Sequence, residues 1–69
     1  MKLSARNILK GRILAVQRGA TTSHIRLELA GGAVVTASIT NEAVDDLHLA
    51  VGQDAYAVIK ASDVMIGVE

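Results

Sequence analysis

Residues 56–66 read Tyr56-Ala57-Val58-Ile59-Lys60-Ala61-Ser62-Asp63-Val64-Met65-Ile66, so that two apolar runs flank a short polar break. Apolar runs rich in valine and isoleucine are typical of β-strands. We therefore predict strands over residues 54–59 and 64–68, joined by a turn. Backbone N–H groups at such a break can lack partners in the sheet. Together with Lys60 and the hydroxyl of Ser62, they form a set of donors suited to a small oxyanion.

The preceding sequence also predicts strands. Residues 7–18 are apolar on both faces, as in a strand buried on both sides, and Gly11 in this run predicts a bulge or a close backbone approach. Residues 23–29 alternate between apolar and polar side chains. The inward side chains of this strand are expected to be Ile25, Leu27 and Leu29. Gly31-Gly32 predicts a hairpin turn, because both central positions of a type I′ turn need positive φ, and residues 33–40 form the return strand.

A short helix is expected between the third and fourth strands. Asn41 is the predicted N-cap of a helix over residues 42–47, in which Val44 and Leu47 form an apolar stripe. Five strands with one such helix predict an all-β fold, a small five-stranded OB-like barrel. No proline and no low-complexity segment divides the chain, so residues 1–69 are expected to form a single domain.

The composition excludes several function classes. Seven basic and seven acidic residues cancel, so no net charge attracts the chain to nucleic acid or to an anionic membrane. No apolar run reaches the about 20 residues of a membrane-spanning helix, and no signal peptide is recognisable, so a cytoplasmic protein is expected. A chain of this size buries only about 60% of its unfolded surface. Because 51% of the residues are hydrophobic and none is cysteine, we expect stabilisation by homo-oligomerisation.

A second donor-rich segment is Ser4-Ala5-Arg6-Asn7. Taken alone, a lysine in a turn is usually a solvated charge, and terminal segments are often disordered. Taken together, the planar guanidinium group of Arg6 offers paired N–H donors, and the ammonium group of Lys60 offers a point charge. Hydroxyl donors are available from Ser4, Thr40 and Ser62. This set is suited to a tetrahedral dianion, and we predict that the fold or an oligomer brings the two segments together.

The remaining polar residues do not indicate a catalytic or metal site. His24 and His48 are expected to be exposed, and two histidines cannot build a closed zinc site. Asp45 and Asp46 are adjacent on the predicted helix and point in different directions, so they do not form an acid and base pair. Gly31-Gly32 lacks the helix and lysine of a phosphate loop. We therefore expect no enzyme, no catalytic cofactor and no metal coordinated directly by protein atoms.

Four motifs carry a family resemblance. They are, in chain order, Ser4-Ala5-Arg6-Asn7, Leu9-Lys10-Gly11, Ala37-Ser38-Ile39-Thr40 and Ile59-Lys60-Ala61-Ser62-Asp63-Val64-Met65. With these motifs the chain resembles, over essentially its whole length, the molbindins, small Mop-domain proteins that bind molybdate. It departs from them in the helix, where Ala43 and His48 stand in place of a serine and a glycine that relatives often have.

The resemblance implies an OB-like fold assembled as a hexamer, a trimer of dimers, with molybdate or tungstate bound between subunits and no catalysis. It implies that the Ser-Ala-Arg-Asn segment of one chain meets the threonine ending the third strand and the Lys-Ala-Ser turn of another. The oxyanion-binding residues carried over in this way are Ser4, Ala5, Arg6, Asn7, Thr40, Lys60, Ala61 and Ser62. We expect these groups to bind only the oxo atoms of the anion.

Three functions are compatible with these residues. The first is intracellular molybdenum storage or homeostasis, the second an oxyanion-sensing regulatory or oligomerisation module, and the third a nucleic-acid-binding OB domain. Single strands are bound by stacking bases on aromatic side chains, and Tyr56 is the one aromatic residue, so the third is disfavoured. Storage is preferred to regulation because no DNA-reading segment is recognisable beside the barrel.

Overall fold

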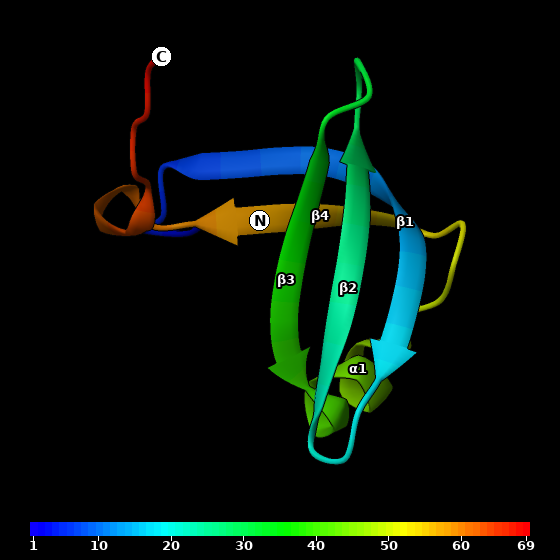
Figure 1. The fold of residues 1–69 in the computed structure, drawn as a ribbon. Coiled ribbons are helices and arrows are strands. Elements are labelled where there is room, and N and C mark those ends of the chain that lie inside the picture. The colour runs from blue at the N-terminus through cyan, green and yellow to red at the C-terminus, as the bar shows by residue number, and fades with distance from the viewer.

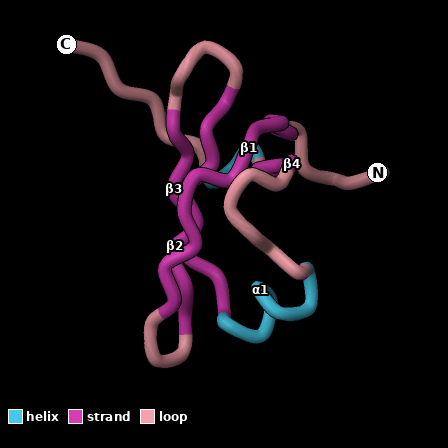
Figure 2. The backbone as a smooth tube through the Cα atoms, turned by 90° about the vertical axis from the view of Figure 1, so that its right-hand side faces the viewer, coloured by secondary structure: helices cyan, strands magenta, loops and turns pink.

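The computed structural model describes residues 1–69 as one four-stranded antiparallel sheet with a short helix and a 3-10 turn (Figure 1). The elements are β1 (Asn7–Arg18), β2 (Thr22–Leu29), β3 (Val34–Thr40), α1 (Asn41–Leu47), β4 (Asp54–Ile59) and the 3-10 turn η1 (Ala61–Asp63). The strand order is β3-β2-β1-β4. The fold is mostly β, as predicted, and the sheet curls into a half-barrel (Figures 1 and 2). No helix is long and apolar enough to cross a membrane.

Strand β1 belongs to both halves of the sheet. Residues 7–12 pair with β4, and residues 11–18 pair with β2. The register shifts between Ile13 and Ala15, and such a bulge bends a strand and increases its twist. The β1–β4 half of the sheet therefore runs across the β2–β3 half (Figure 1).

Gly11 lies where the two halves of the sheet overlap, paired with both Leu29 and Ala55. A Cβ atom at Gly11 would lie 2.5 Å from the carbonyl oxygen of Glu28 and 2.9 Å from Cγ of Leu27. The close backbone approach predicted at Gly11 is confirmed. The bulge lies a few residues further along the same strand.

The hydrophobic core is small, because only five of the 69 residues are buried. They are Ile13, Ser23, Ile25, Leu27 and Val44. Strand β2 contributes three of them at alternate positions, which confirms the predicted alternation. In helix α1, Val44 is buried but Leu47 is 61% exposed, so the prediction of a two-residue buried stripe is half wrong. The helix is only seven residues long and covers one end of the core.

The helix begins one residue earlier than predicted. Thr40, not Asn41, is the N-cap, and its hydroxyl accepts a hydrogen bond from the backbone N of Ala43 at 3.1 Å. The side chain of Asn41 is engaged elsewhere, since it accepts from the hydroxyl of Ser23 and donates to the carbonyl of Gly19 at 3.0 Å. Because that amide holds the β1–β2 turn, the preceding threonine caps the helix.

The structure has four strands, not the five predicted. Residues 64–68, the expected fifth strand, form no strand in the chain and extend as a tail after η1 (Figure 1). The side chains of Met65, Ile66 and Val68 are 93%, 89% and 94% exposed. Strands β3 and β4 consequently have one neighbour each, and the sheet of the single chain stays open.

Candidate oxyanion-binding site

The two donor-rich segments meet where β1 begins and β4 ends. Asn7 and Ile59 are paired across the sheet, and Nδ2 of Asn7 donates a hydrogen bond to the carbonyl oxygen of Ile59 at 3.2 Å. The segment Ser4-Ala5-Arg6 immediately precedes this pair, and Lys60-Ala61-Ser62 immediately follows it. One chain therefore brings seven of the eight predicted site residues to the same end of the sheet.

Turn η1 leaves backbone donors free beside Lys60. The N–H of Asp63 bonds to the carbonyl of Lys60 at 2.9 Å, which closes the turn. The N–H groups of Ala61 and Ser62 lie at the start of this turn, and the first N–H groups of a helix have no acceptor within the helix. They make none of the turn and loop hydrogen bonds of the chain, and no side chain caps them. These N–H groups are available to an anion.

The positive charges at this end of the sheet have no acidic partner in the chain. The one ion pair of the structure joins Arg18 to Asp45, far along the sequence from either segment. Arg6 and Lys60 are both exposed and unpaired, and Asp63 makes no ion pair with them. The arrangement is an open cluster of donors and cations, which is the electrostatic requirement of an anion site.

Thr40, the eighth predicted residue, lies elsewhere. It ends β3, pairs with Thr22 of β2, and adjoins α1. In Figure 1, α1 and η1 lie at different ends of the molecule, whose longest extent is 34 Å. A single chain therefore does not bring Thr40 to the cluster formed by Arg6 and Lys60.

The hydroxyl of Thr40 nevertheless keeps a proton that it can donate. Its oxygen accepts a hydrogen bond from the N–H of Ala43, and no hydrogen bond of the chain uses its own proton. The sequence did not predict the hydrogen bond from the Ser23 hydroxyl to the side chain of Asn41, the residue that follows Thr40. One signal was present: Ser23 is a polar residue at an inward-facing position of β2, and it is fully buried. A buried hydroxyl needs a partner, and Asn41 provides it.

The other polar groups do not form a second site. His24 and His48 are exposed, and no group of three or more histidine, cysteine, aspartate or glutamate side chains could hold a metal ion. Asp45 is bonded to Arg18 at 2.8 Å, and this hydrogen bond holds the pKa of the Asp45 carboxyl below its ordinary value. This pair connects α1 to the end of β1 on the surface.

Comparison with known proteins identifies the family of this chain. The TOBE domain model matches residues 3–66. A protein of Haemophilus influenzae described as a probable molybdenum-pterin-binding protein is 44% identical over 69 residues, which are 100% of both chains. The chain belongs to the TOBE-domain family, among the Mop proteins. The resemblance seen in the four sequence motifs is thereby confirmed.

Solved Mop structures have the same fold. MopII from Clostridium pasteurianum superposes with a TM-score of 0.91 at 39% identity, covering 97% of this chain and 100% of MopII. ModG, described as a cytoplasmic molybdate-binding protein and solved with molybdate bound, gives a TM-score of 0.95 at 46% identity. The match covers 100% of this chain and 49% of ModG, so this Mop chain spans about half of that protein.

Proposed function

We propose that this Mop chain binds molybdate, without catalysing a reaction, at sites formed between the subunits of a homo-oligomer. The observation that carries the proposal is the cluster at the start of β1 and the end of β4. There, Arg6, Lys60 and two free N–H groups lie together without an acceptor in their own chain. Membership in the Mop family and the molybdate bound to the relative ModG support the identity of the anion.

Each proposed site residue has a role suited to an oxo atom. Arg6 offers two parallel N–H donors, Lys60 a point charge, and Ala61 and Ser62 their backbone N–H groups. Hydroxyl donors are Ser4, Thr40 and Ser62; Ala5 contributes its backbone, and Asn7 positions the segment. The groups offered to the anion are all hydrogen-bond donors toward its oxygen atoms, so the anion is held by charge-assisted hydrogen bonds and no protein atom coordinates its metal.

The site is shared because one chain cannot complete it. Thr40 lies at a different end of the molecule from Arg6 and Lys60, which supports a site that the Thr40 hydroxyl of another subunit completes. Closing the exposed cluster against a partner excludes water, which strengthens each hydrogen bond to the anion. The same closure brings cations close together when the site is empty, so anion binding and assembly stabilise each other. A hexamer built as a trimer of dimers fits this sharing.

The proposed role is intracellular storage and homeostasis of molybdenum. Residues 1–69 act as one binding domain, and tungstate, a tetrahedral dianion like molybdate, binds at the same donors. A cytoplasmic location is supported by the description of the relative ModG as a cytoplasmic protein.

Calorimetric titration of the full chain with molybdate, tungstate, sulfate and phosphate tests this function. Hydrogen bonds to charged groups contribute about 1.5–3 kcal/mol each, and about 1.4 kcal/mol is tenfold in affinity. Arg6→Ala and Lys60→Ala are therefore each expected to raise the Kd for molybdate about tenfold or more. Arg26→Ala, which removes an equal and exposed charge from the middle of β2, is the matched control and should bind as the unmodified chain does. Unchanged affinity in both site variants would reject the assignment.

A further inference from the structure

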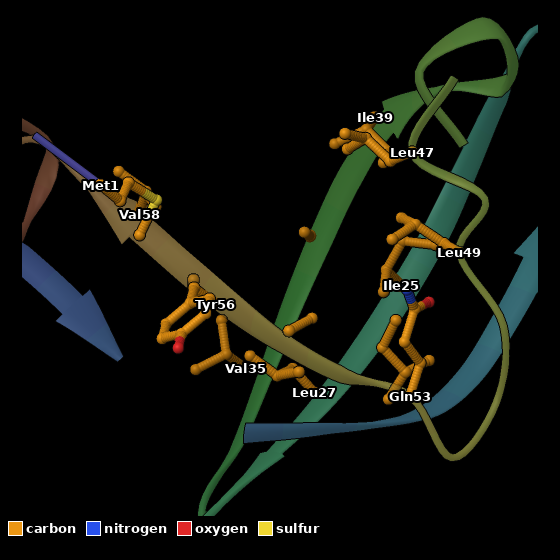
Figure 3. Close-up of a pocket in the computed structure, with 14 residues that line it drawn as sticks. Met1, Ile25, Leu27, Val35, Ile39, Leu47, Leu49, Gln53, Tyr56 and Val58 are labelled. Atoms are coloured by element: carbon orange, nitrogen blue, oxygen red, sulfur yellow. The ribbon is translucent and has the colours of Figure 1, made fainter. Parts of the chain in front are cut away.

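Ser23 is the one polar residue that the structure buries, and the proposed oxyanion site does not use it. It lies at the second position of β2 and is 0% exposed. Ile25 and Leu27 follow at alternate positions of the strand, are also buried, and line an apolar pocket (Figure 3). A hydroxyl therefore ends an inward-facing apolar row, at a position where an aliphatic side chain would need no hydrogen-bond partner.

The partner of Ser23 is the residue that follows Thr40. The Ser23 hydroxyl donates a hydrogen bond to Oδ1 of Asn41, and Nδ2 of Asn41 donates to the carbonyl oxygen of Gly19 at 3.0 Å. The backbone N–H of Asn41 donates to the carbonyl oxygen of Thr21, also at 3.0 Å. Asn41 is thus held by three hydrogen bonds, all of them to the β1–β2 turn and the start of β2.

These hydrogen bonds hold the junction of β3 and α1, where Thr40 lies. Thr40 is paired with Thr22 of β2 on one side and is followed by the anchored Asn41 on the other. Neither element is stable at this point by itself, because β3 has one neighbouring strand and α1 has seven residues. Isolated helices shorter than about 12–15 residues are only marginally stable. The position of Thr40 therefore depends on the bonds to Asn41.

We propose that Ser23 and Asn41 are positioning residues for the oxyanion, which act through the hydroxyl of Thr40. They fix the end of β3, so that Thr40 is presented in one arrangement to the neighbouring subunit. A donor that is held in place before the ligand arrives loses less conformational entropy on binding, so preorganisation raises affinity. The inference rests on the proposed function, because it takes Thr40 to contact the anion.

A double-mutant cycle in the calorimeter separates positioning from packing. Loss of a buried hydrogen bond lowers the free energy of unfolding in either case, but residues that act through one contact have non-additive effects on binding. Ser23→Ala should raise the Kd for molybdate about three- to tenfold. In a Thr40→Val chain, which has no hydroxyl to position, Ser23→Ala should change the Kd by less than about twofold. An equal rise of the Kd in both chains would overturn the inference.

Two further variants make the result independent of a single substitution. Asn41→Ala, at a half-buried position, should repeat the result of Ser23→Ala, including its dependence on the Thr40 hydroxyl. Ile25→Val is the matched control, because it also removes packing from the inward face of β2 and lowers stability. Its Kd for molybdate should equal that of the unmodified chain. A Kd raised as much by Ile25→Val as by Ser23→Ala would assign the effect to general loss of stability and overturn the inference.

The same titrations distinguish failure of this inference from failure of the proposed function. An unmodified chain that binds no molybdate would reject the proposed function and this inference with it. If the unmodified chain binds molybdate and Arg6→Ala weakens the binding, the proposed function stands. Additive effects of Ser23→Ala and Thr40→Val on the Kd would then reject this inference alone.

Discussion

Asn7 and Ile59 lie opposite each other at the first position of β1 and the last position of β4, joined by a side-chain hydrogen bond of 3.2 Å. These residues are 52 positions apart in the chain. Their pairing is the reason that Arg6 and Lys60, each one residue beyond the pair, stand at the same end of the sheet. The proposed anion site thus depends on a contact between the first and last strands.

The first prediction concerns this contact. Asn7→Ala removes one hydrogen bond, which contributes about 0.5–1.5 kcal/mol to the free energy of unfolding. We expect a loss of stability in that range, measured by urea denaturation, and weaker molybdate binding by calorimetry, because the two segments lose a direct connection. Ile8→Val, a small change at the next, exposed position of β1, is the control. Molybdate affinity that is unaffected by Asn7→Ala would show that this bond does not position the site.

Thr40 has two separable roles, as helix cap and as anion donor. Serine preserves both, so Thr40→Ser should retain stability and affinity. Aspartate is a good N-cap but offers no proton when ionised and repels a dianion. We therefore expect Thr40→Asp to keep the free energy of unfolding and to lose molybdate affinity by more than about tenfold. Equal molybdate affinity in the serine and aspartate variants would exclude a donor role for this hydroxyl.

Glycine is required at position 11 because the backbone of β2 leaves no space for a Cβ atom there. A methyl group at Gly11 would meet the carbonyl of Glu28, which is fixed in the sheet. Overpacking of this kind costs about 1–3 kcal/mol, so Gly11→Ala should lower the free energy of unfolding by that amount in a denaturant titration. Lys10→Ala, at the neighbouring exposed position, should change it little. A stable Gly11→Ala variant would mean that β1 and β2 can separate at no cost.

The Arg18–Asp45 pair predicts a pH dependence of stability. Arg18 lowers the pKa of Asp45 in the folded state, so the unfolded state binds a proton more readily. The contribution of the pair is therefore present above the ordinary pKa of 3.8 and is lost as the pH falls through the lower, folded value. Asp45→Asn should lower the Tm slightly at neutral pH and not at strongly acidic pH.

Two comparisons check that assignment. Asp46→Asn, at an adjacent carboxylate without an ion pair, should show no such difference. Because the pair is exposed, added salt should reduce the effect. If the Tm of Asp45→Asn stays below that of the unmodified chain at strongly acidic pH, the loss of stability does not come from the Arg18–Asp45 pair.

Bound molybdate should stabilise the folded assembly. A ligand present at a hundredfold excess over its Kd adds about 2.7 kcal/mol per site, so the Tm should rise with molybdate concentration. Sulfate at the same concentration is the control for ionic strength. A Tm that responds equally to both anions would contradict a site built for molybdate.

The features that the sequence predicted correctly are those that depend on residues close together in the chain. The limits of β1 and β4 were correct because apolar runs and their polar ends are local signals. Both glycines of the β2–β3 hairpin have positive φ, as the turn chemistry requires. The helix cap was misplaced by one residue because Asn41 bonds to Ser23, 18 positions away, and no local pattern contains that contact.

The fifth strand could not be placed from the pattern alone. Residues 64–68 have the composition of a strand, but a strand also needs an adjacent edge, and the chain turns at η1 before reaching one. For the site, the grouping of seven residues follows from the register of β1 and β4. Thr40 lies apart from them in the single chain, and its part in the site rests on the proposed contacts between copies, which periodicity does not encode.

The open half-barrel also has a consequence for the freshly synthesised protein. The single chain displays two unpaired strand edges and an exposed apolar tail, a combination that favours aggregation. Under the proposed assembly, low expression or dilution would prolong this state and leave the chain open to proteases. The rate at which copies associate would then influence how much of the protein accumulates.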